Sequence, residues 1–231
     1  MRNMDLTAEL VALVDRMEPD PGPEPGTSDH TDADLHDMAT ALLAEYNPKH
    51  LWVFAYGSLI WNPEFQADEQ RPAVAAGWHR SFCLKLTRWR GTRELPALML
   101  ALDRGGTCLG IAYRSPEDDM HGQIVRLLKR ELDAKPPTNI AKWINVSTTS
   151  GRLKTLAFVA LRTGGAYAGK RPLPEVASVL SRAAGHWGSS AQYAFNTITK
   201  LEEHGIRDRN LWKIQKLMAE QIWESQRQQV S

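Results

Sequence analysis

The stretch Val53-Phe54-Ala55-Tyr56-Gly57-Ser58-Leu59-Ile60-Trp61 decides the fold of this chain. It begins with apolar and β-favouring residues, a pattern typical of a buried strand. The pattern breaks at Gly57, which lets another group approach the backbone closely, and Ser58 adds a hydroxyl beside backbone N–H groups. Such a strand end can present donors to an anionic or zwitterionic ligand, but a tight turn after a core strand is equally compatible with the pattern.

Composition narrows the class of protein. The 231 residues are enough for one sizeable domain or two small ones, and 42% hydrophobic with 24% charged residues is ordinary for a globular protein. A net charge of +1 gives no bulk field that would recruit nucleic acid or an anionic membrane. No apolar run approaches the roughly 20 residues that span a bilayer, and the first residues lack a secretory apolar region. We therefore expect a cytoplasmic protein with no nucleic-acid or membrane partner.

The two cysteines and seven histidines give no sign of a metal or redox centre. Cys83 and Cys108 both fall in apolar, strand-like segments outside any Cys-x-x-Cys, so we expect reduced core thiols. A redox pair would need their Cα atoms within about 7 Å of each other. The histidines lack metal-ligand spacing, and no nucleotide-binding glycine motif is present, so we expect no metal and no cofactor.

The first fifty residues are organised differently from the rest. Apolar spacing predicts helices over 6–17 and 35–46, the second capped by Asp32 or Asp34. Residues 19–34 between them, the acidic segment, are rich in Pro, Gly and acidic residues, a composition typical of a mobile linker. We expect residues 1–50 to form N-terminal helices with a linker, and residues 51–231 to form the main domain.

Within the main domain, strands come first and helices follow. Period-two alternation predicts strands over 82–86, 98–102 and 109–113, with Gly105-Gly106 as a hairpin turn between the last two. A further strand and three helices are expected at 153–161, 176–184, 192–201 and 210–222. This order favours an α+β fold with a small, closed barrel.

A carboxylate continues an apolar helix face after Tyr113. Ser115 can cap this helix, and acidic residues from Glu117 on suit its dipole. Extending the apolar stripe by helical spacing from Leu127 leads to Glu131. Burying an unpaired carboxylate costs several kcal/mol, so either its pKa rises or a partner is present. A base poised near neutrality suits proton abstraction from an ammonium group. A Glu that reaches solvent, or pairs with Arg88 or Arg90, stays an open alternative.

Several segments together resemble one known family. Residues 53–63 read Val-Phe-Ala-Tyr-Gly-Ser-Leu-Ile-Trp-Asn-Pro, which looks like the signature of the ChaC-type γ-glutamylcyclotransferases. Further matching segments follow in order at 77–83, 90–92, 110–114, 129–131, 183–185 and 191–193, so the resemblance runs from about Leu51 to about Leu217. It implies a mixed β-barrel of the γ-glutamylcyclotransferase type with surrounding helices. It also implies a lyase that cleaves γ-glutamyl peptides, typically glutathione, to 5-oxoproline and cysteinylglycine without a cofactor.

The resemblance assigns roles to individual residues. Glu131, directly after Arg130, corresponds to the family's general base. The turn after the first strand would hold the substrate's α-carboxylate or the developing oxyanion through backbone N–H groups. The substrate-binding residues implied are Val53, Phe54, Ala55, Tyr56, Gly57, Ser58, Leu59 and Tyr193. From the residue alone, Tyr193 is equally compatible with a core position. Arg80 reads as a solvated strand edge or as a bidentate ligand of substrate carboxylates.

The chain departs from the family pattern in two places. Residues 132–139 lack the glycines and the tyrosine that commonly follow the catalytic Glu, and Pro96-Ala97-Leu98 stands where relatives show Pro-Gly-Arg. Recognition beyond the glutamyl group is therefore open, and a cyclotransferase for other γ-glutamyl compounds is an alternative. A non-catalytic binding or regulatory protein on the same fold is another. Retention of Glu131 argues for the enzyme, because a binding module has no need for a carboxylate on an apolar face.

Overall fold

The computed structural model describes residues 3–116, 118–132 and 134–230, which form two compact units. The first unit comprises Met1–Glu24, Phe82–Leu100 and Ala168–Ser231, and the second comprises Pro25–Ser81 and Ala101–Tyr167. Each unit is therefore assembled from segments that are distant in the sequence. The boundary expected at residue 50 stays a prediction.

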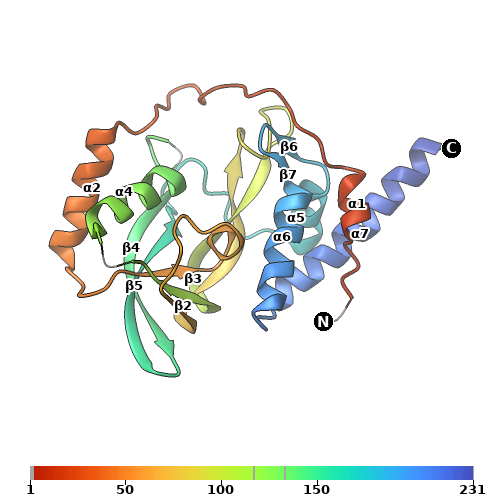
Figure 1. Ribbon diagram of the computed structural model, residues 1–231. Helices are drawn as coiled ribbons and strands as arrows, with labels where there is room; N and C mark the ends of the chain where they lie inside the picture. The colour runs from red at the N-terminus through yellow and green to blue at the C-terminus, as the bar shows by residue number, and fades with distance from the viewer. Residues whose placement is uncertain (1–2, 117, 133, 231) are drawn as a thin grey trace. The chain divides into compact units, whose positions relative to one another are not determined.

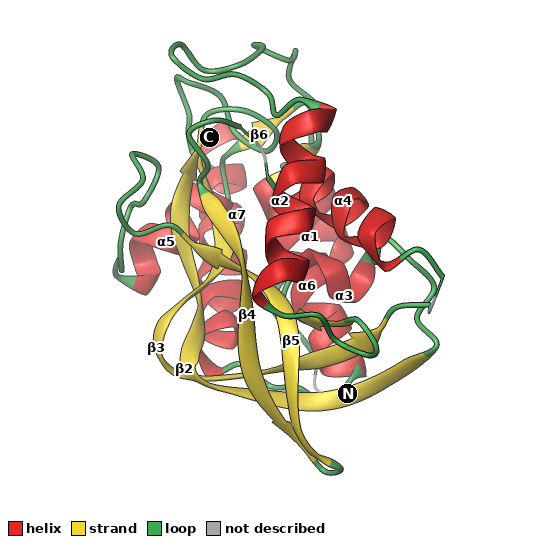
Figure 2. Cartoon of the chain, turned by 90° about the vertical axis from the view of Figure 1, so that its left-hand side faces the viewer, coloured by secondary structure: helices red, strands yellow, loops and turns green. Residues whose placement is uncertain are grey.

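Five strands form a closed barrel in the order β1-β3-β2-β4-β5. Figure 2 labels β2, β3, β4 and β5. Their bounds are Trp52–Ala55 for β1, Glu69–Leu86 for β2, Ala97–Arg114 for β3, Asn139–Thr148 for β4 and Gly151–Ala160 for β5. The strand β1 pairs antiparallel with β3, where Phe54 faces Ala112, and parallel with β5, where Val53 faces Leu156. The expected α+β fold with a small mixed barrel is confirmed.

The position of β1 between two neighbours explains its composition. All four of its residues are buried, and β3 and β5 pair with its two edges, which is the pattern of a strand covered on both faces. Phe54 belongs to a cluster that fills the second unit, together with residues such as Leu102, Ala112, Ala157 and Val159. The strand end that follows is thus anchored in a buried apolar cluster of this unit.

The glycine pair in β3 does not form the expected hairpin turn. Residues 97–114 are one continuous strand, and Gly105 and Gly106 lie within it with φ of 101° and 71°. Two successive positive φ values bend a strand without ending it, and glycine adopts them at little cost. The expected strands over 98–102 and 109–113 are therefore two parts of β3.

Three helices belong to the second unit: α2 (Asp32–Glu45), α3 (Ser58–Trp61) and α4 (Met120–Glu131). The helices α2 and α4 pack against each other (Figure 1). The cap of α2 is Thr31, which forms a capping box with Asp34, so the expected cap at Asp32 or Asp34 is wrong by one residue or more.

The start of α4 also differs from the expectation. Its N-cap is Asp119, whose side chain accepts a hydrogen bond from the Gly122 N–H at 2.9 Å. Ser115 therefore does not cap the helix, because the chain needs four more residues to turn from β3, and Asp tolerates the left-handed φ of 50° found at this cap. Glu117 lies outside the described residues.

The first unit is mainly helical. It contains α1 (Ala8–Ala12), α5 (Leu173–Leu180), α6 (Ser190–Glu203) and α7 (Arg209–Val230), with a two-stranded sheet of β6 (Ala184–Gly185) and β7 (Gly188–Ser189). The helix α5 packs on α7, and α1 contacts both α6 and α7 (Figure 1). The helix α1 is shorter than the predicted 6–17, since only the part with buried Leu10 and Val11 finds a packing surface while Leu13 is exposed.

Two further expectations concern chemistry rather than shape. Cys83 and Cys108 are both buried thiols outside any disulfide, as expected for core cysteines. Within the described part of the chain, no helix combines the length and the apolar character that crossing a membrane requires.

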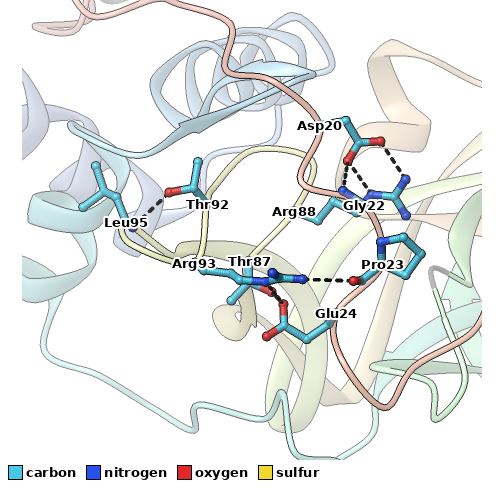
Figure 3. Close-up of polar contacts among 9 residues, drawn as sticks. All are labelled: Asp20, Gly22, Pro23, Glu24, Thr87, Arg88, Thr92, Arg93 and Leu95. Carbon is cyan, nitrogen blue, oxygen red and sulfur yellow. Dashed lines mark hydrogen bonds and ion pairs between the residues drawn. The ribbon is translucent and has the colours of Figure 1, made fainter.

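The first part of the acidic segment has specific partners in the first unit (Figure 3). The Asp20 carboxylate accepts two hydrogen bonds from the Arg88 guanidinium, each of 2.7 Å. Glu24 accepts one from the Thr87 hydroxyl at 2.6 Å and another from Arg93 at 3.3 Å. Arginines of the 87–93 stretch thus contact the acidic side chains of a segment that the sequence predicts to be a mobile linker, and its mobility stays a prediction.

The second part of this segment has partners in the second unit. The backbone groups of Ser28 and Lys135 exchange two hydrogen bonds, of 3.1 and 2.8 Å. The Lys135 ammonium also forms an ion pair with Asp34, which lowers the pKa of that carboxyl. Lys135 follows Glu131 by four residues, so residues 28–34 contact the stretch where this chain departs from the family pattern.

The contact between Asp20 and Arg88 should be detectable as a lowered pKa of the Asp20 carboxyl. Hydrogen bonds from Arg88 lower the pKa of Asp20 to about 2. Because the folded pKa is depressed, the contact contributes stability above the ordinary pKa of about 4, and the contribution disappears as pH falls from about 4 to 2. The Gly22 N–H donates to Asp20 at 3.0 Å, so its amide NMR signal should titrate near pH 2.

Arg88→Gln should move that titration to about pH 4, the ordinary value for Asp. Arg93→Gln is the matched control, since Arg93 contacts Glu24 and Pro23 rather than Asp20, and should leave the midpoint near 2. A midpoint near 4 in the unaltered protein would show that the acidic segment is not held by Arg88 in solution.

Candidate active site

The turn after β1 is a junction between a strand and a short helix. Tyr56 follows the strand, and Gly57 is the N-cap of α3. The Ile60 N–H donates to the Gly57 carbonyl at 2.9 Å, and the Asn62 N–H donates to the Ser58 carbonyl at 2.8 Å. As the first residues of a helix, Ser58 and Leu59 have N–H groups with no carbonyl to meet inside α3. These two N–H groups are the donors that the turn can offer to a ligand.

The side chain of Arg80 holds the turn through its main chain. Its Nε donates to the Tyr56 carbonyl at 2.6 Å, and its Nη2 donates to the Leu109 carbonyl. Only 6% of Arg80 is exposed, so its interpretation as a solvated strand edge is wrong. A buried guanidinium on two main-chain carbonyls is a strong, charge-assisted contact, and it joins the end of β1 to β3.

Two further contacts hold the end of β1. The Tyr56 hydroxyl donates to the Phe158 carbonyl in β5 at 2.8 Å. On the β3 side, Gly110 packs so closely that a Cβ on it would lie 2.4 Å from the Ala55 carbonyl oxygen and 2.6 Å from the Phe54 ring. The main chain before the turn is therefore held by β3 and β5 together with Arg80.

Glu131 is the last residue of α4 and continues its buried face, as the sequence predicts. Ile124, Leu127 and Leu128 form that face, and 16% of the Glu131 side chain is exposed. Its carboxylate Oε1 lies 3.1 Å from the Nε of Arg130, an arginine that the sequence did not single out as its partner. Glu131 is thus largely withdrawn from water and has a neighbouring cation.

Burial decides the protonation of this carboxyl. Loss of hydration raises the pKa of Glu131 from 4.5 to about 7, against the lowering effect of Arg130 and with a smaller raising effect of Glu64. The sequence predicts either a raised pKa or a partner for this carboxyl, and the structure has both. A carboxylate that exchanges its proton near neutral pH has the property that a general base requires.

Arg130 connects Glu131 to the polypeptide that follows the turn. Its Nη1 lies 3.1 Å from the Oε2 of Glu64, and Glu64 comes three residues after α3 ends at Trp61. One guanidinium thus bonds the end of α4 and the segment that leaves the Tyr56-Gly57-Ser58 turn. The base and the donors that the resemblance assigns must lie close together to act on one substrate; this contact supports such a placement, which stays a prediction.

The other residues expected in the substrate site lie in two different places. The side chains of Val53, Phe54, Ala55 and Leu59 are buried, so they support the turn, and their contact with a substrate stays a prediction. Tyr193 lies on α6 in the first unit, where it is buried, packs edge-on against Phe82, and faces the Arg90 guanidinium at 5.4 Å. Its role toward substrate also stays a prediction.

Sequence reasoning missed Glu64, Gly110 and the backbone contacts of Arg80. Gly110 and Arg80 both fall in segments that carry the family resemblance, which was the available signal, whereas nothing around Glu64 distinguishes it from a surface acid. As for metals, the residues that the structure describes contain no group of three or more His, Cys, Asp or Glu side chains placed to hold an ion.

Known proteins resemble this chain over most of its length. Residues 51–221 match the family described as ChaC-like protein. The glutathione-specific gamma-glutamylcyclotransferase of Escherichia coli (strain K12) is 33% identical over 188 residues, which cover 79% of this chain and 80% of that protein. Gamma-glutamylcyclotransferase 2-3 of Arabidopsis thaliana is 30% identical over 168 residues, covering 70% and 84%.

A solved structure supports the fold. The crystal structure of a yeast gamma-glutamylcyclotransferase specific to glutathione superposes with a TM-score of 0.66 at 21% identity. The match covers 75% of this chain and 97% of the yeast chain. The barrel with its helices is therefore the architecture of a solved cyclotransferase.

Proposed function

The chain belongs to the ChaC-like family, and we propose from this premise that it cleaves glutathione by intramolecular cyclisation, releasing 5-oxoproline and cysteinylglycine. The observation that carries the proposal is Glu131, a largely buried carboxyl with a pKa of about 7. Arg130 ties it to the segment after the Tyr56-Gly57-Ser58 turn. The relatives named as glutathione-specific support the choice of substrate.

The reaction needs one proton acceptor and a folded substrate. The ionised Glu131 takes a proton from the α-ammonium group of the γ-glutamyl unit, and the free amine attacks the γ-carbonyl carbon. A C–N bond forms and closes a five-membered ring, while the amide C–N bond to cysteine breaks. The proton held by Glu131 passes to the departing amide nitrogen, so the base is regenerated and no water is consumed. Ring closure within one molecule supplies a high effective concentration if the glutamyl unit is held bent.

The turn supplies the electrostatic part of the mechanism. The N–H groups of Ser58 and Leu59 bind the α-carboxylate of the substrate or the oxyanion that develops on the γ-carbonyl oxygen. Donors that are fixed before the reaction need no reorganisation during it. The contacts of Arg80 and Gly110 with the preceding main chain provide that rigidity. A cytoplasmic location fits the two buried thiols outside any disulfide.

Substrate choice is the point on which this chain should differ from its relatives. Residues 132–139 lack the usual glycines and tyrosine, and Lys135 is engaged by Ser28 and Asp34. Because a site that loses polar contacts discriminates less against smaller analogues, we expect both glutathione and γ-glutamyl-alanine to be cleaved, with a weaker preference for glutathione than a glutathione-specific enzyme shows.

The test is 5-oxoproline release, measured as kcat/KM for glutathione and γ-glutamyl-alanine side by side. Cleavage of γ-glutamyl-alanine alone would leave the reaction class standing and exclude glutathione as the substrate. Absence of 5-oxoproline from both, and from a wider panel of γ-glutamyl compounds, would favour the non-catalytic alternative.

A further inference from the structure

We propose that Glu64 is a positioning residue for Glu131 and acts on it through Arg130. Nothing in the family resemblance assigns Glu64 a role, and the inference follows from three charged side chains of the second unit. It deepens the proposed function, on which it rests only in taking Glu131 as the base. The contacts themselves can be tested without any turnover.

The geometry shows why an outside anchor is needed. Arg130 and Glu131 are consecutive residues of a helix, and consecutive side chains point in directions about 100° apart, so they do not face each other. The Arg130 guanidinium nevertheless lies with its Nε 3.1 Å from the Glu131 carboxylate. Its Nη1 lies 3.1 Å from Glu64, on the chain segment after α3. Glu64 therefore holds the arginine in the bent conformation in which it also reaches Glu131.

Burial of the Arg130 side chain strengthens its contacts with the two carboxylates. Only 17% of the Arg130 side chain is exposed, so water competes weakly for its donors. A planar guanidinium offers separate edges to two carboxylates, and each contact restricts the other. Without Glu64, Arg130 would be free to turn toward solvent or to give both edges to Glu131. In either case the carboxyl would lose the contact geometry that fixes its orientation.

The charge of Glu64 acts in the same direction as burial. An arginine paired with Glu131 alone would stabilise the carboxylate anion and make it a weaker base. Glu64 shares that positive charge and adds a negative one, and its effect on the pKa of Glu131 is upward. Other charged side chains of this unit have partners of their own: Lys129 with Asp32, Lys135 with Asp34, and Glu69 with Arg114. Glu64 is therefore the acidic side chain that shares the arginine of Glu131.

The experiment follows the titration of Glu131 directly. The full-length protein is labelled with ¹³C at glutamate carboxyls, and the Glu131 signal is assigned by its disappearance in Glu131→Gln. In Glu64→Gln, the titration midpoint of this signal should fall from about 7 by roughly half a pH unit. A shift of that size is expected when one nearby negative charge is lost from a partly screened site. Glu64→Asp keeps the charge and should retain most of the original midpoint.

Glu69→Gln is the matched control. Glu69 is also an acid of the second unit paired with arginine, and 34% of its side chain is exposed against 38% for Glu64. It should leave the Glu131 midpoint unchanged. An unchanged midpoint in Glu64→Gln, or an equal shift in Glu69→Gln, would overturn the positioning role.

The pH dependence of activity measures the pKa of the base independently of the NMR signal. The acid limb of kcat/KM against pH reports the base of the free enzyme, so it should move to lower pH in Glu64→Gln by the same amount as the NMR midpoint. An acid limb that stays in place while the NMR midpoint moves would overturn the role of Glu64 in catalysis. If the unaltered protein releases no 5-oxoproline while the midpoint still shifts, the positioning of Glu131 stands and the proposed function fails.

Discussion

Glu131→Gln is expected to lower 5-oxoproline release by about 10²-fold or more, since glutamine keeps the shape of the side chain but cannot accept the ammonium proton. The amide oxygen can still accept from the Nε of Arg130, so the end of α4 should keep its structure. Binding of the γ-glutamyl group should persist, because the donors of the turn are untouched. The loss should therefore appear in kcat rather than in KM.

The same variant should be more stable than the unaltered protein at neutral and higher pH. The folded pKa of Glu131 is raised from 4.5 to about 7, so its ionisation favours the unfolded chain. Stability linked to this group is fully present below pH 4.5 and is lost as pH rises to 7. The loss amounts to at most about 3 kcal/mol, and glutamine removes it.

Thermal unfolding at pH 5 and pH 8 checks this expectation beside the activity assay. The gain in melting temperature should be larger at pH 8, and Glu69→Gln should show neither the gain nor the loss of activity. Near-normal 5-oxoproline release by Glu131→Gln would reject Glu131 as the base. An equal gain in melting temperature at pH 5 and pH 8 would reject the raised pKa of Glu131.

Gly110→Ala is expected to have the second largest effect. The added Cβ would lie 2.4 Å from the Ala55 carbonyl oxygen and 2.6 Å from the Phe54 ring, and the first of these is main chain that no side-chain rotation can relieve. Overpacking of this kind costs about 3 kcal/mol, and the strand must shift by a fraction of an ångström or more. Because the shift occurs directly before Tyr56, it should displace the donors of the turn and reduce kcat/KM by roughly 10²-fold.

Gly165→Ala is the matched control for this substitution. Gly165 belongs to the same unit, and a Cβ there meets nothing within 4 Å. Its free energy of unfolding from urea titration and its kcat/KM should stay close to those of the unaltered protein. An unperturbed Gly110→Ala variant would mean that β1 and β3 are packed less tightly in solution than in the structure.

Local pattern was sufficient for the features that depend on one segment. The apolar run before Tyr56 predicted β1, and the spacing from Leu127 placed Glu131 on the buried face of α4, where either a raised pKa or a partner was expected. In both cases the alternation or helical spacing of neighbouring residues carries the information, because burial of one face of an isolated element is already visible in the sequence.

Features that depend on distant partners could not be predicted in this way. Gly105-Gly106 has the local sequence of a hairpin turn, and only the pairing of β3 with both β1 and β5 shows that the strand continues through it. The Glu64 carboxylate meets Arg130 across 66 positions of sequence, and Asp20 meets Arg88 across 68. No periodicity within either segment records such a contact.

Arg80 donates to main-chain carbonyls, so the donor and the acceptor positions of these contacts differ in how well they tolerate substitution. Every residue type carries a carbonyl, so replacement of Leu109, a residue that is 49% exposed, leaves the acceptor for Arg80 in place. No other side chain offers the same fork of donors, so Arg80 itself has no substitute. Substitutions should therefore be tolerated at Leu109, which contributes only its main chain to this contact, and not at Arg80, which donates.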